Sequence, residues 1–249
     1  ALLIGGSLGK MGSISLATKA CLKSGAGLAT ACVPKCGIDI LQTVIPEAMV
    51  LPNEGEFFLE GNIALANKTS IGIGVGAGKE EKTAQLLKNL IAEANAPLVI
   101  DADALNLISK KIQLAPLNFH SVLTPHPGEA ARLLATDVTT INADRFKAAE
   151  QLRIQYQATV ILKGAGSVIA TDAGLAVCPY GNPGMATGGM GDVLSGVIGG
   201  LLAQGLNVTD AAQLATVIHA KAADNLAKQH GQKGLLASDV IPEIRRLVN

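Results

Sequence analysis

The sequence predicts an α/β fold in which a mostly parallel central sheet is covered by helices on both faces. Short apolar runs alternate along the 249 residues with longer segments of helical spacing. The runs are continuously apolar, as expected of strands that are buried on both faces of a sheet. Strands that alternate with helices are typical of parallel sheets between two helical layers. The sequence contains no internal repeat and no Pro/Ser-rich linker, so we predict a single domain over residues 1–249.

The predicted elements follow one another in regular order. Strands are expected at residues 2–4, 28–33, 71–75, 98–100, 122–124 and 160–163. Helices are expected at residues 12–23, 79–94, 127–135 and 143–156, with Asn142 and Thr209 as N-caps and Gly25 and Gly205 as stops. The charge-free stretch 193–209 is shorter than the roughly 20 apolar residues of a membrane span. We therefore expect a buried helix that starts near Asp192 and stops before Gly205.

A small antiparallel flap interrupts this alternation. Residues 167–170 and 175–178 are two short strand-like runs, and Thr171-Asp172-Ala173-Gly174 between them has the composition of a turn. The flap follows the strand that ends at Lys163. It leads directly into a glycine-rich segment at residues 181–192, after which the long apolar helix begins.

Composition excludes several classes of protein. Twenty Lys and Arg balance twenty Asp and Glu, and 49% of residues are apolar, which excludes intrinsic disorder. A neutral chain with four Phe, two Tyr and no Trp lacks the basic face and stacking rings of a nucleic-acid binder. The four cysteines lack zinc-site spacing, so we expect reduced thiols in a cytoplasmic protein that does not bind membranes. The chain opens inside an apolar run without Met, and we expect that residues preceded Ala1.

The strongest chemical signal lies at residues 188–192. Gly188, Gly189 and Gly191 open an apolar helix, and backbone N–H groups at such a helix start bind phosphate or another anion. Asp192 can be read as a first-turn carboxylate that favours the helix dipole, or as a base that faces a substrate hydroxyl. We favour the base, because a carboxylate inside an anion site would otherwise repel the phosphate.

Three further glycine loops follow predicted strands. Residues 5–10 lack the spacing of a Walker phosphate loop, and residues 72–78 lack that of a Rossmann site. In the third, residues 163–167, Lys163 and flexible backbone donors could hold the phosphates or ribose of a nucleotide, or could simply enter a hairpin. Each loop alone is read as a tight turn. With residues 188–192 the chain has four such loops, which favours ligand binding, because open α/β sheets bind ligands at the carboxyl ends of their strands.

Two polar segments end neighbouring predicted strands. Asp101, Asp103 and Asn106 are read equally well as a helix cap with a first-turn acid or as a site for a metal or hydroxyl. His126 lies between two prolines and near Glu129, on the ligand side of the sheet, which favours contact with substrate over a structural role. No Ser or Cys lies in a nucleophile elbow, so covalent hydrolase chemistry is not supported.

Taken together, eight ordered motifs resemble the ADP/ATP-dependent NAD(P)H-hydrate dehydratases. The motifs are GGSLGKMGSISLATKACLKSGAGLAT, IPEAMV, GVGAG, DADALN, LTPHPGEAARLL, ILKGAGS, NPGMATGGMGDVLSGVIGGLLAQG and LLASDVIPEIRRL. This resemblance implies a ribokinase-like fold, a three-layer α/β/α sandwich with a small β flap. The family also occurs as the C-terminal half of a bifunctional protein whose other half is an NAD(P)HX epimerase, and this chain is similar to that half.

The resemblance implies a repair reaction on nicotinamide cofactors that are hydrated at C6. The (S)-epimer of NADHX or NADPHX is dehydrated to NADH or NADPH, coupled to hydrolysis of ADP or ATP to AMP or ADP and phosphate. Phosphorylation of the C6 hydroxyl turns a poor leaving group into a good one. Mg²⁺ is the implied cofactor, and bacterial members of the family are often tetramers.

The resemblance also implies roles for individual residues. Asp192 takes the hydroxyl proton, and the N–H groups of Gly189 and Gly191 stabilise the transferring phosphoryl group. Glu129 matches the last place of an Asn-x-x-Glu-like spacing and is expected to contact the metal through water. The AMP part of the nucleotide is expected at Lys163, Gly164, Ala165, Gly166, Ser167 and Gly191. The hydrated cofactor is expected at Ser13, Gly76, Gly78, His126 and Asp192.

Two departures and two alternatives accompany this resemblance. Met190 stands where the family commonly has Thr, and Ser13 where many members have Ala; neither is expected to abolish activity. A small-molecule kinase of the same fold, acting on a thiazole or pyrimidine vitamin precursor, would keep Asp192 but leave a stable phosphorylated product. A nucleotide-sensing protein would bind without turnover, and the retained Asp192 argues against it.

Overall fold

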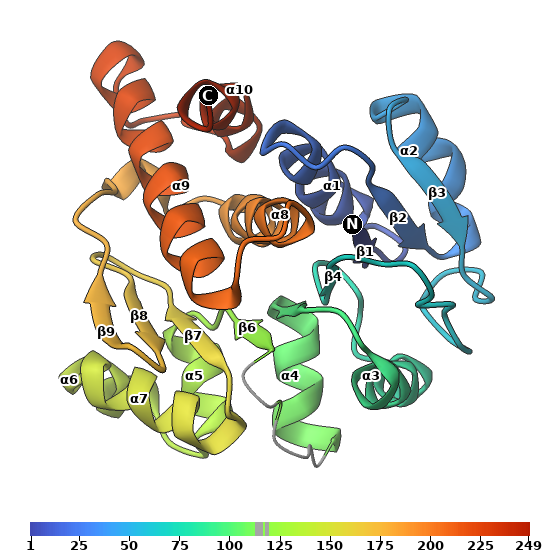
Figure 1. Ribbon diagram of the computed structural model, residues 1–249, viewed down its shortest axis with the longest axis horizontal. Coiled ribbons are helices and arrows are strands. Elements are labelled where there is room, and N and C mark those ends of the chain that lie inside the picture. Colours follow the sequence, from blue (N-terminus) through green and yellow to red (C-terminus); the bar gives the residue numbers. More distant parts are fainter. Residues whose placement is uncertain (113–116, 118–119) are drawn as a thin grey trace.

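A nine-stranded sheet forms the centre of the computed structural model, which describes residues 1–112, 117 and 120–249. The strands are β1 Leu2–Ile4, β2 Thr30–Val33, β3 Met49–Pro52, β4 Ile71–Ile73, β5 Leu98–Ile100, β6 Ser121–Leu123, β7 Thr159–Leu162, β8 Val168–Thr171 and β9 Gly174–Val177. They lie in the order β3-β2-β1-β4-β5-β6-β7-β8-β9 (Figure 1). Strands β1 to β7 pair in parallel, whereas β8 pairs antiparallel with both β7 and β9. The predicted parallel sheet and antiparallel flap are confirmed.

Helices cover both faces of the sheet (Figure 1). One face carries α3 Glu81–Glu93, α4 Ala102–Lys111, α5 Pro127–Leu133, α6 Val138–Ala143 and α7 Arg145–Tyr156. The other carries α1 Met11–Lys23, α2 Ile38–Val44, α8 Met190–Ala203, α9 Val208–His230 and α10 Ala237–Leu247. Successive strand residues point to opposite faces, so Ile100 packs in the first layer and Val99 in the second. Among the described helices, none combines the length and hydropathy that a membrane crossing requires.

The structure corrects both predicted N-caps. The cap of α7 is Asp144 and not Asn142, and the cap of α9 is Asn207 and not Thr209. In each case an Asx side-chain oxygen accepts a hydrogen bond from the backbone N–H three residues on, which satisfies one of the free donors of the first turn. The buried helix α8 starts two residues before the predicted start at Asp192.

Several elements lie outside the predicted ranges, among them β3, α2, α4, α9 and α10. Strand β3 lies at the edge of the sheet, is only partly buried and ends in Pro52, which an edge strand tolerates because one side of its hydrogen-bond ladder is unpaired. The α9 sequence is rich in alanine, and its wide apolar face gives a weak helical period.

Helix α8 packs directly against α1 because glycines replace side chains at the contact. A Cβ atom at Gly196 would lie 2.1 Å from the carbonyl oxygen of Ala17, and one at Gly200 would lie 2.1 Å from Ser24 Oγ. No side chain fits at either position. The contact holds α8 against the sheet, with the glycine-rich loop at its N-terminus near the carboxyl ends of the strands.

Replacement of Gly196 by alanine tests this packing. We expect Gly196→Ala to lower the free energy of unfolding by about 2–3 kcal/mol, because the cost of moving α8 off α1 exceeds the roughly 1 kcal/mol that alanine gains in helix propensity. Gly199→Ala is the matched control in the same helix, since its Cβ would meet only Leu3 Cδ2, at 3.4 Å. Urea denaturation measures both. Equal stabilities of the two variants would contradict the close contact.

Candidate active site

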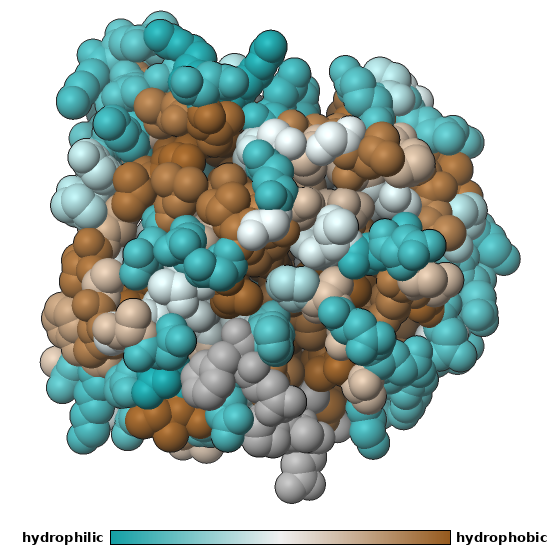
Figure 2. All heavy atoms as spheres, viewed as in Figure 1, coloured by the Kyte–Doolittle hydropathy of each residue, from teal (hydrophilic) through white to brown (hydrophobic). Residues whose placement is uncertain are grey.

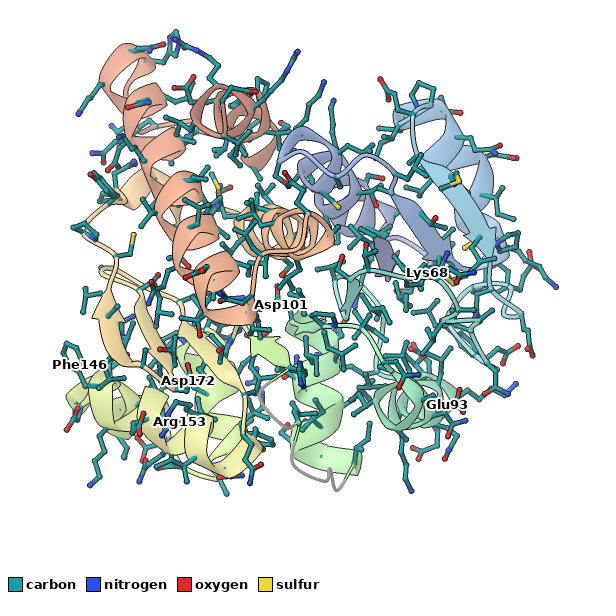
Figure 3. The ribbon with its side chains drawn as sticks, viewed as in Figure 1. Lys68, Glu93, Asp101, Phe146, Arg153 and Asp172 are labelled. Carbon is teal, nitrogen blue, oxygen red and sulfur yellow. The ribbon has the colours of Figure 1, made fainter. Side chains whose placement is uncertain are left out.

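Five strand-end loops and the start of α8 meet at the carboxyl edge of the parallel strands. This convergence follows from parallel pairing, which brings the carboxyl ends of neighbouring strands to one edge. Backbone hydrogen bonds join the loops: Gly6 N–H to Val75 O (2.9 Å), Asp101 N–H to Ile73 O (3.1 Å) and Lys163 N–H to Pro125 O (2.8 Å). Figure 3 places Asp101 near the middle of the fold, between α8 and α4. The predicted position of the glycine loops at the carboxyl ends of β1, β4 and β7 is confirmed.

Asp101 joins three segments of the chain at this edge. Its side chain is buried, with 2% exposed, and its Oδ1 accepts hydrogen bonds from Lys163 Nζ and from Ala102 N–H, both at 2.8 Å. Oδ2 accepts from Ser195 Oγ at 2.7 Å. The carboxylate therefore caps α4, pairs with the lysine after β7 and binds α8. Of the two interpretations of Asp101, the helix cap is confirmed, and its charge is used in an ion pair.

Lys163 lies beneath the first turn of α8. Burial alone would lower the pKa of Lys163, but the carboxylates of Asp101 and Glu129 outweigh it and raise this pKa above its usual value. A Cβ atom at residue 191 would lie 3.1 Å from Lys163 Nζ, so Gly191 lets the lysine approach the helix start closely. The ammonium group and the free N–H groups of the turn thus form one positively polarised surface.

Asp192 occupies the third position of α8, beside that surface. Burial raises the pKa of Asp192 to about 6; a hydrogen bond from Ser13 opposes the rise, and the negative charge of Asp101 adds to it. A carboxylate with such a pKa is ionised at neutral pH and is a better proton acceptor than an ordinary aspartate. Gly189 before it adopts a left-handed conformation (φ +90°), in which a Cβ would lie 2.6 Å from Leu16 Cδ1.

His126 and Glu129 form a capping box at the start of α5. His126 Nδ1 accepts a hydrogen bond from Gly128 N–H (3.0 Å), and Glu129 Oε2 accepts one from His126 N–H (2.8 Å). Burial and the charge of Lys163 lower the pKa of His126, so the ring is neutral. Burial raises the pKa of Glu129 to about 7. The His126 side chain remains half exposed at the site.

The loop after β7 leads into the flap. Ser167 Oγ donates back to Gly164 O at 3.2 Å, and Gly164 and Gly166 both have positive φ. Arg145 from α7 holds the loop from outside, with hydrogen bonds to Ala165 O and Leu162 O. The sequence did not reveal Arg145, because nothing in its local pattern separates it from an ordinary surface arginine.

The loop after β4 faces helix α1. A Cβ at Gly76 would lie 3.0 Å from Ser13 Cβ, and Gly78 N–H donates to Asp103 Oδ2 at 3.0 Å. Asp103 also pairs with Lys10 Nζ (3.2 Å) and Lys79 Nζ (3.4 Å). Asp103 therefore acts as an anchor between two lysines.

The described residues contain no group of three His, Cys, Asp or Glu side chains that could hold a metal ion. Both oxygens of Asp101 accept hydrogen bonds. Glu129 Oε2 accepts a hydrogen bond from His126 N–H and lies 3.9 Å from Lys163 Nζ. This donor set does not fit a metal bound directly by the protein. A contact of Glu129 to a metal through water stays a prediction.

Comparisons with known proteins agree over nearly the whole chain. A family model described as NAD(P)H-hydrate dehydratase (Carb_kinase) matches residues 1–246. The bifunctional NAD(P)H-hydrate repair enzyme Nnr of Vibrio cholerae is 41% identical over 249 residues, which cover 100% of this chain and 49% of that protein. The ADP-dependent (S)-NAD(P)H-hydrate dehydratase of Neisseria meningitidis is 38% identical, over 99% of this chain and 84% of that protein. The chain thus spans about half the length of the bifunctional relatives that it matches.

Solved structures agree in fold. The ADP/ATP-dependent NAD(P)H-hydrate dehydratase from Bacillus subtilis, co-crystallized with ATP/Mg²⁺, has a TM-score of 0.84 and 29% identity; the match covers 100% of this chain and 89% of that one. A ribokinase-like superfamily protein from Enterococcus faecalis has a TM-score of 0.87 and 28% identity, over 99% of this chain and 85% of that one. The predicted ribokinase-like fold is confirmed.

Removal of the Ser195 hydroxyl tests its hydrogen bond to Asp101. We expect Ser195→Ala to lower the free energy of unfolding by about 1.5–3 kcal/mol, because a buried carboxylate loses one hydrogen-bond donor. Ser15→Ala is the matched control: Ser15 is also a buried helical serine, but it donates to Met11 O of its own helix, and its loss should cost about 0.5 kcal/mol or less. Thermal and urea denaturation measure the difference. A Ser195→Ala variant as stable as Ser15→Ala would show that Asp101 does not depend on this bond.

Proposed function

Because the chain belongs to the NAD(P)H-hydrate dehydratase family, we propose that it dehydrates the (S)-epimer of NADHX or NADPHX in a reaction coupled to hydrolysis of ADP or ATP. The observation that carries the proposal is the arrangement around α8: a carboxylate with a pKa of about 6 at Asp192, beside free helical N–H groups and the Lys163 ammonium. A base and an anion-stabilising surface are the two devices that phosphorylation of a hydroxyl requires.

In the first step, Asp192 accepts the proton of the C6 hydroxyl as its oxygen attacks the terminal phosphoryl group of the nucleotide. The new P–O bond forms while the bond to AMP or ADP breaks. The N–H groups of Gly189 and Gly191 and the nearby Lys163 ammonium stabilise the negative charge of the transferring group. Asp101 holds Lys163 in this position through their ion pair.

In the second step, phosphate leaves. The lone pair of the ring nitrogen expels it by breaking the C6–O bond, and loss of a proton from C5 restores the double bond of the dihydronicotinamide. Phosphate leaves readily where hydroxide would not, so consumption of the nucleotide drives the dehydration.

The remaining site residues divide into two groups around Asp192. The substrate side is assigned to Ser13, Gly76 and Gly78 together with His126. Support for it comes from the hydrogen bond of Ser13 to Asp192 and from the contact of Gly76 with Ser13. The nucleotide side is assigned to Lys163, Gly164, Ala165, Gly166, Ser167 and Gly191.

We assign Mg²⁺ to the nucleotide and not to a protein-built centre. When bound, the ion would neutralise part of the charge of the phosphates. Glu129 could reach it only through water, because its Oε2 already accepts from His126 N–H and its Oε1 lies 3.3 Å from His126 Nε2.

Assembly and partners remain proposals. We propose a cytoplasmic homo-oligomer, a tetramer as in many bacterial relatives, that acts with an NAD(P)HX epimerase, fused or separate. Figure 2 shows apolar side chains at the surface on the side that carries β8, β9 and α9. Leu175, Val177 and Leu214 are among the exposed apolar residues there, and a second copy of the chain would cover them.

A coupled assay tests the activity itself. We expect absorbance at 340 nm to rise when the protein meets purified hydrated NADH with Mg²⁺ and either ADP or ATP, in step with release of AMP or ADP. Formation of a stable phosphorylated alcohol from a thiazole or pyrimidine precursor, without that rise, would instead identify a kinase. Nucleotide binding without any turnover would identify a sensor.

The role of Asp192 is tested by Asp192→Asn. We expect kcat to fall about 10³-fold or more while nucleotide binding, measured by calorimetry, is retained. Asp239→Asn is the matched control, since Asp239 occupies the same third position of α10 but lies outside the proposed site. Unchanged turnover in Asp192→Asn would exclude it as the base.

The pH dependence follows from the pKa of Asp192. A base must be ionised, so kcat/KM should be full at neutral pH, half-maximal near pH 6 and lost as pH drops further. Ser13→Ala removes the hydrogen bond that lowers this pKa, and should move the acid limb to higher pH. An acid limb that stays in place, or moves to lower pH, would contradict the assignment.

A further inference from the structure

We propose that Arg145 is a positioning residue that holds the loop at residues 163–167 in the conformation that binds the phosphoryl donor. Arg145 lies in the first turn of α7, which packs beside β7 and β8 (Figure 1). It lies outside the glycine-rich segments from which the site was predicted. The inference rests on the proposed function, because it takes residues 163–167 as the part of the site that binds ADP or ATP.

The guanidinium group of Arg145 binds this loop at two points. Nη2 donates to Leu162 O at 3.0 Å, and Nη1 donates to Ala165 O. Gly164 permits this approach, since a Cβ atom at residue 164 would lie 2.9 Å from Arg145 Nη2. Gly164 also has a φ of +150°, a conformation that favours glycine. The arginine and the loop therefore fit one another only with glycine at residue 164.

The two contacts determine where the N–H groups of the loop point. The C=O and N–H of a planar trans peptide unit point in opposite directions. The Leu162 carbonyl faces Arg145, and the N–H of the same peptide unit, which belongs to Lys163, donates instead to Pro125 O at 2.8 Å. By the same geometry, the second carbonyl contact turns Gly166 N–H away from the arginine.

The loop contains backbone donors that the protein itself does not use. The N–H groups of residues 164–166 donate to no other group in the described part of the chain. Consecutive free N–H groups in a tight turn form a concave site for an anion such as phosphate. Because Arg145 binds carbonyl oxygens of this loop, its free donors stay available to a ligand.

The guanidinium group lacks a counter-charge. Arg145 forms no ion pair with any carboxylate that the structure describes, and its buried Nε has no hydrogen-bond acceptor among the described residues. Burial lowers the pKa of Arg145, and no neighbouring carboxylate opposes this. A partly buried cation without a partner costs free energy. Phosphate groups bound at the loop would offset that cost, so a bound nucleotide would stabilise Arg145 and the loop together.

Lys163 is fixed independently of Arg145. Its ammonium group pairs with Asp101 at 2.8 Å, and its backbone N–H donates to Pro125 O. Loss of Arg145 should therefore weaken binding of the phosphoryl donor more than it disturbs the chemistry that follows.

Replacement of Arg145 by methionine separates positioning from a purely structural role. We expect Arg145→Met to raise the Kd for ADP, measured by calorimetry, and the KM for ADP or ATP about tenfold or more, because two hydrogen bonds from a charged donor are lost. The value of kcat at saturating nucleotide and the KM for hydrated NADH should change less than about twofold. Lys147→Met is the matched control: it removes the same charge from an exposed side chain two residues further along α7, and the Kd for ADP should stay as in the wild type.

A second pair of variants tests the contact even if Arg145→Met does not fold. Gly164→Ala places a methyl group 2.9 Å from Arg145 Nη2 and should raise the Kd for ADP and the donor KM in the same way. Gly174→Ala is its control, since Gly174 also has a positive φ but its Cβ would meet nothing within 4 Å. This control should bind ADP as the wild type does.

The outcomes keep this inference apart from the proposed function. Wild-type ADP binding in Arg145→Met or in Gly164→Ala would overturn the role of Arg145, as would an equal loss of binding in Lys147→Met or Gly174→Ala. A wild-type protein that binds ADP but turns over no hydrated cofactor would instead overturn the proposed function. In that case weaker ADP binding by Arg145→Met would still support its role in holding the loop.

Discussion

The ion pair between Asp101 and Lys163 is the interaction on which the site depends. It joins the end of β5 to the end of β7, and the hydrogen bond from Ser195 ties α8 to the same carboxylate. A buried charge is tolerable only when it is paired and hydrogen-bonded, so these groups fix one another's positions. Because Gly191 leaves room for the ammonium group, the pair also sets how closely the start of α8 approaches the sheet.

Two carboxylates beside this ion pair, Glu129 and Asp192, hold protons more tightly than ordinary carboxylates. Burial raises the pKa of Glu129 to about 7 and that of Asp192 to about 6, and the charge of Lys163 opposes both rises. Asp192 is thereby suited to accept a proton near neutral pH. Lys163 supplies the charge that stabilises an anion, and Asp192 beside it is the base.

The sequence alone predicted the parts of the fold and of the candidate site that follow from local patterns. The parallel sheet, the flap and the loop at Asp192 follow from apolar runs and glycine spacing. Contacts between distant segments could not be predicted: Ser195 lies 94 positions from Asp101, and Lys10 lies 93 positions from Asp103. The cap predictions at Asn142 and Thr209 were wrong for a local reason, because neighbouring polar residues compete for the same first turn and geometry selects Asp144 and Asn207. The roles of the individual site residues remain predictions.

The central claim is that the C6 hydroxyl is phosphorylated before it leaves. It is tested most directly with hydrated NADH that carries ¹⁸O in that hydroxyl, followed by mass spectrometry of the released phosphate. Attack of this oxygen on the nucleotide and later cleavage of the C6–O bond place one ¹⁸O atom in each phosphate formed. Unlabelled phosphate, with the ¹⁸O recovered in water, would mean that hydroxide leaves directly and would contradict the account.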